Sequence, residues 1–448
     1  MKKRFFVSSI IFILVLSMAS SVLAYAFPQP DWGKLFEERK AMVSAVDFEL
    51  YAEDSYDSAP YFYEKFEPRG GTYLGTVVDN SAKFKPLGSY ITNIDEMNNT
   101  DLYYPANTII PKDNVVTLIG WTIYDLSKVN YNTVRKTLNN LNKYNKPMLI
   151  RFANEMNCSS LGDNPKKYVE IFRNVAKMIK EYPNFGVVWS PNDIGALDRP
   201  FEYYYPGDEY VDWVGVSCYT MKYFQGKKNT STKDSIFFMT GDNAWATNKL
   251  KPFMEFLKKN KIRKPVMLSE CGVATSNKFG ENLTEWTKPR MRNLLWNVIM
   301  KYPQIKMINY FDYYRKGANE SYNISAYPYA CEIFNEAKRS GAYIREYGKN
   351  ANFVFQSVGN AGNIDADSNG IVNFYTLAHI PGYPVLTVNY FIDGKWYTMS
   401  SKAPYKCKID LNKLADGKHT VTISTIGNKK DYVFYKKGNC IRLNSEPR

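Results

Sequence analysis

Short apolar runs recur along the first three quarters of the chain, and the segments between them carry apolar residues at every third or fourth position. The apolar runs are residues 71–78, 115–120, 147–152, 186–190, 210–219, 264–273 and 305–311. The segments between them that are most clearly predicted as helices are 131–143, 164–179 and 289–301. Strands that alternate with helices, without hairpin signals, are typical of a parallel sheet. The pattern predicts an α/β fold, a (β/α)8 barrel, although the second strand has no clear signal within 81–113.

Two of the apolar runs end in a glutamate. The stretch from Pro147 to Asn157 passes from four apolar residues to Arg151, Asn154 and Glu155, and the stretch from Lys264 to Val273 carries Glu270. The C-terminal ends of barrel strands form one rim, where the chemistry of such barrels takes place. An acidic residue at the end of a buried strand is costly unless it has a use. Two glutamates on one rim are the arrangement that a retaining glycosidase needs.

The positions of the histidines and cysteines exclude several kinds of catalytic site. The two histidines, His379 and His419, lie far downstream, which excludes a Ser-His-Asp triad or a histidine-rich zinc site in the first 378 residues. The six cysteines match no metal-binding motif. We therefore expect catalysis by carboxylates, with no metal ion and no organic cofactor. Cys407 and Cys440 are candidates for a disulfide.

The composition changes after a last predicted helix at 330–341. A polar linker at 342–352 is followed by short strands and by the turns Asp393-Gly394 and Asp416-Gly417. This pattern predicts a small all-β sandwich. The segments 390–395 and 414–421 resemble bacterial immunoglobulin-like modules, so we assign 346–448 to an immunoglobulin-like sandwich.

The N-terminus has the build of a secretory signal peptide. Residues 2–4 are basic, residues 5–16 are apolar, and small residues near 22–26 suit cleavage. We assign 1–26 to this signal and 27–345 to the barrel domain with an N-terminal extension that begins with a helix at 32–46. The mature protein should be secreted, outside the membrane and monomeric.

The net charge of +14 raises the question of an acidic partner. A basic protein could associate with an anionic cell wall, but the 44 acidic residues favour a mixed, solvated surface. The chain has no compact cluster of lysine and arginine, so we expect no nucleic-acid partner.

The two glutamates lie within motifs that resemble a known enzyme family. Five motifs follow one another in its order: 71–75 (GTYLG), 151–157 (RFANEMN), 188–192 (VWSPN), 205–215 (YPGDEYVDWVG) and 268–272 (LSECG). Over about 35–340 the chain is similar to clan A glycoside hydrolases, and most similar to family 26. The resemblance implies that Glu155 is the general acid/base and Glu270 the nucleophile. That family usually has histidine where this chain has Asn154; asparagine at this position elsewhere in the clan holds the sugar 2-hydroxyl.

Further residues near the strand ends are candidates for substrate binding. We expect Arg151 and the Tyr219 hydroxyl to hydrogen-bond Glu270, and burial together with the charge of Glu270 to raise the pKa of Glu155. Either residue could instead have a purely structural role. Trp121, Trp189 and Tyr310 could form sugar platforms or fill the core. Asn192 and Asp193 are weaker candidates.

The sequence therefore predicts a secreted, retaining endo-β-glycanase that acts on a polysaccharide of the mannan or β-glucan type. The alternative is a non-catalytic protein that binds a cell wall or polysaccharide through a barrel that has lost its activity.

Overall fold

The computed structural model describes residues 32–55, 59–77, 83–95, 110–193, 199–228, 241–359 and 362–443. The predicted signal peptide at 1–26 lies outside these ranges. Within them, no helix has the length and apolar character needed to cross a bilayer.

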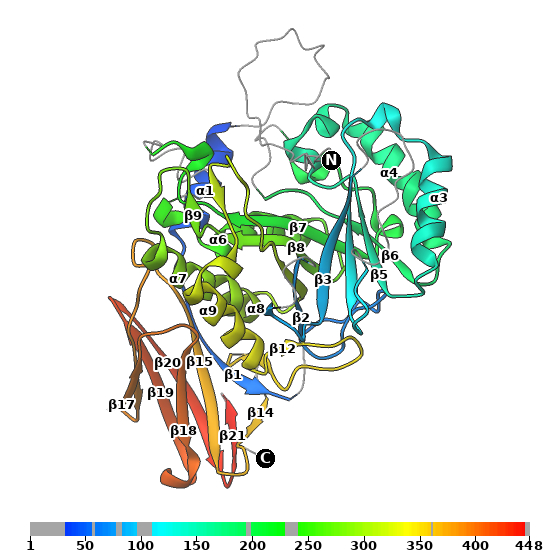
Figure 1. The fold of residues 1–448 in the computed structure, drawn as a ribbon. Coiled ribbons are helices and arrows are strands. Elements are labelled where there is room, and N and C mark those ends of the chain that lie inside the picture. The colour runs from blue at the N-terminus through cyan, green and yellow to red at the C-terminus, as the bar shows by residue number, and fades with distance from the viewer. Residues whose placement is uncertain are drawn as a thin grey trace.

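Eight parallel strands close into a barrel (Figure 1). Closure is made by the last strand, which pairs with the first: Met307 lies opposite Tyr73, and Tyr310 opposite Thr76. The predicted (β/α)8 barrel is thereby confirmed, and its second strand is β3, inside the weakly patterned region. The strands are β2 (Thr72–Val77), β3 (Ser89–Asp95), β4 (Val116–Thr122), β5 (Met148–Phe152), β6 (Phe185–Trp189), β7 (Trp213–Thr220), β8 (Val266–Val273) and β10 (Ile305–Tyr310), with β12 (Tyr343–Ile344) added beside β2.

Helices surround the barrel as the periodic segments predicted. The helix at 165–180 begins as expected, because the Asn164 side chain accepts a hydrogen bond from the Lys167 amide and Pro165 occupies the first turn. The helices are α1 (Trp32–Ser44), α3 (Tyr131–Asn142), α4 (Pro165–Lys180), α6 (Ala246–Lys259), α7 (Thr284–Arg292), α8 (Val298–Lys301) and α9 (Pro328–Arg339), and a π-helical turn, Asn293–Asn297, joins α7 to α8.

Side chains alternate along each barrel strand between the barrel interior and the helix layer. In β5, Leu149 packs in the interior cluster with Trp213 and Met267, whereas Met148 and Ile150 pack toward the helices. Because the period of a strand is two, Arg151 shares the inner face with Leu149. Arg151, which follows the apolar run, therefore places its cation in the interior at the C-terminal end of the barrel.

Two antiparallel sheets form the C-terminal sandwich. They enclose a second core, to which Phe374 and Tyr405 contribute from one sheet and Val388 and Phe434 from the other. The resemblance to an immunoglobulin-like module stays a prediction. The first sheet has the order β13 (Val354–Ser357), β1 (Asp47–Asp54), β15 (Ile371–His379), β18 (Tyr405–Asp410); the second has the order β14 (Asn363–Asp365), β21 (Cys440–Leu443), β20 (Asn428–Lys437), β19 (Gly417–Thr425), β16 (Val388–Ile392), β17 (Lys395–Ser400).

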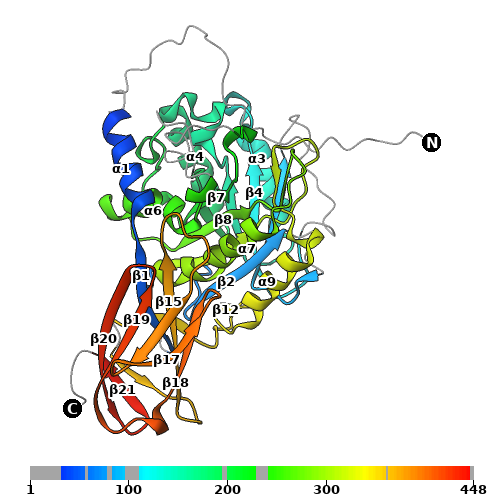
Figure 2. The same cartoon turned by 90° about the vertical axis from the view of Figure 1, so that its left-hand side faces the viewer.

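The N-terminal extension contributes a strand to the C-terminal sandwich. Strand β1 lies between β13 and β15, and Figure 2 shows it beside β15. Leu50 and Ala52 are buried in the sandwich core, and Tyr51 between them is buried in the barrel core. Strand β1 therefore belongs to the sandwich, although its residues lie within the predicted barrel domain at 27–345.

The candidate disulfide between Cys407 and Cys440 is not formed. Cys407 lies in β18 and Cys440 in β21, which belong to different sheets, and both are free thiols. Cys218 and Cys271 in the barrel strands, like Cys407, are buried as small packing residues.

Candidate active site

Glu270 reaches the barrel interior because strand β8 contains an irregularity. Val216 of β7 pairs with Leu268, but the next residue, Ser217, pairs with Glu270, so β8 has one extra residue at Ser269. A bulge of this kind reverses the direction of the side chains that follow it. Ser269 already points inward, since its hydroxyl accepts a hydrogen bond from Ser190. The bulge lets the next residue, Glu270, face inward as well.

Arg151 is fully buried and connects Glu270 to two serines. Its Nη1 donates to Glu270 Oε1 at 2.5 Å, and its Nη2 donates to Ser217 Oγ at 2.5 Å. Its Nε donates to Ser190 Oγ at 2.9 Å. A guanidinium held at three nitrogens has a fixed orientation, which a flexible ammonium would not have. The expected Arg151–Glu270 contact is present, and the serines that position it were missed from the sequence.

Tyr219 provides the second hydrogen bond to Glu270. Its hydroxyl donates to Oε2 at 2.7 Å, as expected, so each carboxylate oxygen has its own donor. Burial, followed by the charge of Glu270, raises the pKa of Tyr219 well above its usual value. The phenol therefore stays protonated and remains a donor. Tyr322 packs against its ring at 4.6 Å between centroids and fixes its position.

Glu155 lies just beyond β5 on an unusual turn. Ala153 and Glu155 both have positive φ, 48° and 56°, in the left-handed region that non-glycine residues rarely adopt. The turn is secured by the Glu155 amide, which donates to the Ser190 carbonyl at 2.9 Å. Asn192 Nδ2 donates to Glu155 Oε1 at 3.0 Å. Asn192 is held in turn by Asn157, whose side chain bonds the backbone carbonyl and amide of Asn192 at 2.8 Å each.

The two glutamates have different electrostatic surroundings. Burial raises the pKa of Glu155 above its usual value of 4.5, and the charge of Glu270 raises it further. Arg151, Ser217 and Asn192 oppose this shift but do not cancel it. Arg151 donates a hydrogen bond directly to Glu270, so the cation lies next to Glu270. Glu155 is therefore the carboxyl that favours a proton.

Asn154 lies beside this pair with an unused acceptor. The residue is buried, and its Oδ1 has no hydrogen-bond partner among the described residues. A buried amide oxygen without a partner is costly, so a group that donates to it would be stabilised there. A hydroxyl of a bound ligand fits this role.

The three aromatic residues predicted as sugar platforms lie in the core. Trp121, Trp189 and Tyr310 have no exposed surface, so none offers a face to a ligand. Trp189 packs against Tyr205 and the helix residue Phe253, and the Tyr310 hydroxyl bonds the backbone of Val273. These side chains point away from the barrel interior, which a strand-end position in the sequence does not reveal.

Exposed aromatic surface lies instead on the segment after β10. The Tyr314 side chain is 60% exposed, and Phe311 and Tyr313 are partly buried beside it. Phe311 contacts Tyr219 at 6.1 Å between ring centroids, which places the segment next to the Glu270 site. The aromatic run at 310–314 (YFDYY) indicated this surface in the sequence, but only Tyr310 was predicted to bind a sugar.

The remaining candidates near the site have structural roles. Asp193 forms a buried ion pair with Lys249 of α6 at 2.9 Å. Burial raises the pKa values of Cys218 and Cys271 well above the usual range of a thiol. Thiols of this kind are not nucleophiles at neutral pH. The chemistry of the site therefore rests on its two carboxyls.

Comparison with known proteins identifies relatives of this region. Residues 103–288 match the model of glycosyl hydrolase family 26. A beta-1,3-xylanase from Alcaligenes sp is 29% identical over 198 residues, which are 42% of this chain and 39% of the relative. A second beta-1,3-xylanase, from Vibrio sp, is 28% identical over 42% of this chain and 40% of the relative. The match thus spans about two fifths of the length of these relatives.

Solved structures with a similar course of the chain share little sequence with it. An endo-beta-1,4-mannanase from Cellulomonas fimi aligns with 81% of this chain and 93% of its own, at 12% identity and a TM-score of 0.42. A beta-mannanase from Bacteroides ovatus aligns with 63% and 92%, at 16% identity and a TM-score of 0.42.

Proposed function

Because residues 103–288 match the model of glycosyl hydrolase family 26, we propose that this chain belongs to that family and is a retaining endo-β-glycanase with Glu155 as general acid/base and Glu270 as nucleophile. One observation carries the assignment of roles. Glu270 accepts hydrogen bonds from Arg151 and Tyr219 on its two oxygens, whereas Glu155 has a raised pKa. The carboxylate beside the cation suits attack, and the carboxyl that favours its proton suits donation.

The proposed reaction has two steps. Glu155 donates its proton to the glycosidic oxygen while a Glu270 oxygen attacks the anomeric carbon, so the glycosidic bond breaks and a glycosyl ester forms. Glu155, now ionised, removes a proton from water, whose oxygen attacks the same carbon and releases Glu270. Glu155 ends protonated and Glu270 ionised, as they began.

Sugar binding is assigned to residues around the pair. The Asn154 Oδ1, which lacks a partner among the described residues, accepts a hydrogen bond from a sugar hydroxyl next to the anomeric carbon. The exposed ring of Tyr314 offers an apolar face to a neighbouring sugar. It replaces the three buried aromatic residues as the candidate platform.

The substrate is proposed to be a β-linked polysaccharide. The two xylanase relatives make β-1,3-xylan the first polymer to test, beside β-1,4-mannan and mixed-linkage β-glucan. The basic leader at 1–26 supports export of the protein to the compartment where such polymers occur.

The test is hydrolysis of these three polymers by the mature protein, with wild type compared with Glu155→Gln and Glu270→Gln. We expect reducing ends to appear from at least one polymer with wild type only, and NMR of the first product to show the β-anomer. An α-anomer would contradict the retaining mechanism. Binding without turnover by the wild type on every polymer would favour the alternative, a non-catalytic polysaccharide-binding protein.

A further inference from the structure

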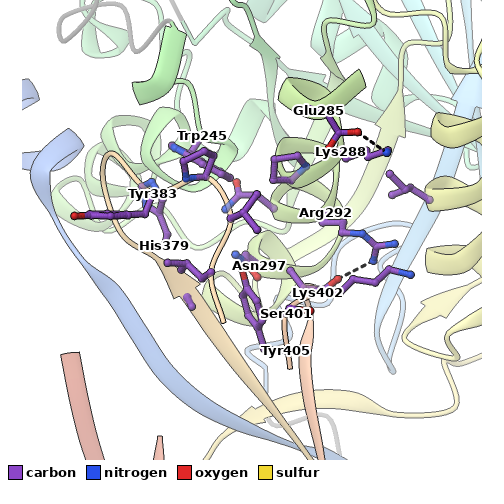
Figure 3. Close-up of a pocket in the computed structure, with 18 of the residues that line it drawn as sticks. Trp245, Glu285, Lys288, Arg292, Asn297, His379, Tyr383, Ser401, Lys402 and Tyr405 are labelled. Carbon is purple, nitrogen blue, oxygen red and sulfur yellow. Dashed lines mark hydrogen bonds and ion pairs between the residues drawn. The ribbon is translucent and has the colours of Figure 1, made fainter. Parts of the chain in front are cut away.

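A cavity of about 320 Å³ lies between the helices of the barrel and the loops of the C-terminal sandwich (Figure 3). Its helical side is formed by the start of α6 and by α7, the π-helical turn and α9, and its other side by the end of β15 and the loops at 380–386 and 401–405. A cavity of this size falls in the range of small-molecule sites. It lies on the outer face of the helix layer, whereas Glu155 and Glu270 lie at the ends of the barrel strands.

Two buried side chains that line this cavity have polar atoms without hydrogen-bond partners among the described residues. They are His379, whose two ring nitrogens are both unpaired, and Asn297, whose Oδ1 is unpaired. Each is about 2% exposed. Such groups are costly when buried unless a partner enters. Because both side chains line one cavity, the cavity suits a ligand that both donates and accepts hydrogen bonds.

The ligand that suits these groups is uncharged. Burial lowers the pKa of His379 to about 4, so its ring is neutral near pH 7 and has one donor and one acceptor nitrogen. The cations around the cavity are already paired: Lys288 with Glu285 at 2.7 Å, and Arg292 and Lys402 with Glu336 at 2.6 and 2.9 Å. Glu332, which also lines the cavity, balances the second of the two cations that share Glu336, so no net charge remains to select an ionic ligand.

Aromatic rings add an apolar component. Trp245 lies against the His379 ring at 5.1 Å between centroids, and Tyr383 at the outer edge of the cavity is 48% exposed. Neutral hydroxyls that donate and accept, combined with apolar ring faces, are the chemistry of a sugar. We propose that this cavity is a second saccharide-binding site, which takes one or two neutral sugar units and is separate from the hydrolytic cleft.

The experiment is calorimetric titration of the full mature chain carrying Glu270→Gln, which prevents turnover, with β-1,3-xylotriose and with β-1,4-mannotriose. At least one of the two sugars should show a site that Tyr383→Ala weakens about two- to tenfold, since loss of ring stacking has that size. The matched control is Tyr314→Ala, another exposed tyrosine, which should weaken only binding in the cleft. Hydrolysis by otherwise wild-type protein should be unchanged by Tyr383→Ala.

His379→Leu separates a binding role from a structural role. Replacing an unpaired buried ring by an apolar side chain should leave the thermal midpoint unchanged or raise it, while saccharide binding at the cavity weakens about tenfold. A lower midpoint with unchanged binding would overturn the proposal. So would the absence of any site sensitive to Tyr383→Ala with both sugars, which would mean that water alone fills the cavity. If the wild type hydrolyses none of the polymers but the cavity still binds a saccharide, only the proposed function is rejected.

Discussion

The Arg151 side chain has no exposed surface, and it donates a hydrogen bond to Glu270 at 2.5 Å. A buried guanidinium needs a carboxylate partner, because a lone charge in the interior costs several kcal/mol. The same contact orients Glu270 for attack. Stability and activity are therefore linked at this one ion pair.

Replacing Glu270 should remove activity, with a smaller loss of stability if the new side chain keeps a hydrogen bond to Arg151. We expect Glu270→Gln to lower kcat at least about a thousandfold, since a neutral amide cannot attack the anomeric carbon. Glu270→Ala should also destabilise the protein by about 3–5 kcal/mol, because Arg151 would be left buried and unpaired. Kinetics and urea unfolding measure the two effects. Glu281→Gln, at the partly exposed ion pair with Lys222, is the matched control and should keep full activity.

Replacing Arg151 by lysine tests whether its geometry matters beyond its charge. Lysine keeps the cation but cannot bind Glu270, Ser190 and Ser217 from fixed positions at once. We expect Arg151→Lys to lower kcat by about a hundredfold with little change in KM. The surface pair of Arg135 with Glu181 provides the control, Arg135→Lys. A lysine variant with wild-type kcat would show that charge alone is sufficient.

The pH dependence of kcat/KM should follow Glu155. The acid must be protonated to act, so activity should fall as pH rises through its pKa, which lies above 4.5. The Asn192 amide stabilises the ionised form, so Asn192→Ala should raise this pKa and move the basic limb to higher pH. Asn174→Ala, at a surface contact with Tyr131, is the control. A limb that moves to lower pH, or does not move, would contradict the role of Glu155.

Glu320 should make the stability of the protein depend on pH. Burial raises its pKa to about 8, although its Oε1 accepts hydrogen bonds from the amides of Lys222 and Tyr223 at 2.9 Å each. The folded protein therefore holds a proton that the unfolded chain has released, and stability falls as pH rises from about 4.5 to about 8. Glu320→Gln keeps the acceptor without the titration. Urea unfolding at several pH values should show a smaller decline for this variant; equal declines would rule out the assignment.

Strand β1 should hold the sandwich together. Leu50 is fully buried in the sandwich core, so Leu50→Ala should destabilise that part of the chain by about 2–5 kcal/mol. Val46, just before the strand, is 47% exposed, and Val46→Ala should change little. Hydrogen exchange across β15 and β16 would locate the effect. Protection lost only in the barrel strands would contradict the placement of β1.

Much of the candidate site was predictable because it depends on local sequence. An apolar run that ends in a carboxylate predicts a buried strand with a polar end, and Glu155 and Glu270 have that pattern. Parallel strands in a closed barrel share one rim, so the alternation of strands and helices already placed both glutamates on it. The partners Arg151 and Tyr219 followed from the same reasoning and from the resemblance to a family.

Other features depend on contacts that are distant in sequence. The bulge at Ser269 turns Glu270 inward, and only pairing with β7 and β10 reveals it. Trp121, Trp189 and Tyr310 are buried and therefore cannot be sugar platforms. The sequence did not reveal this, because a strand-end position does not show on which side of the strand a ring lies.

The amino-acid sequence by itself determined the barrel, apart from its second strand, and singled out the two glutamates at strand ends, since hydrophobic periodicity is a local property of the chain. Only the tertiary structure decided that β1 completes the distant sandwich, that Ser190 and Ser217 hold Arg151, and that His379 and Asn297 share one cavity. These arrangements join residues tens to hundreds of positions apart. Packing and hydrogen bonding select such pairs only once the chain has folded.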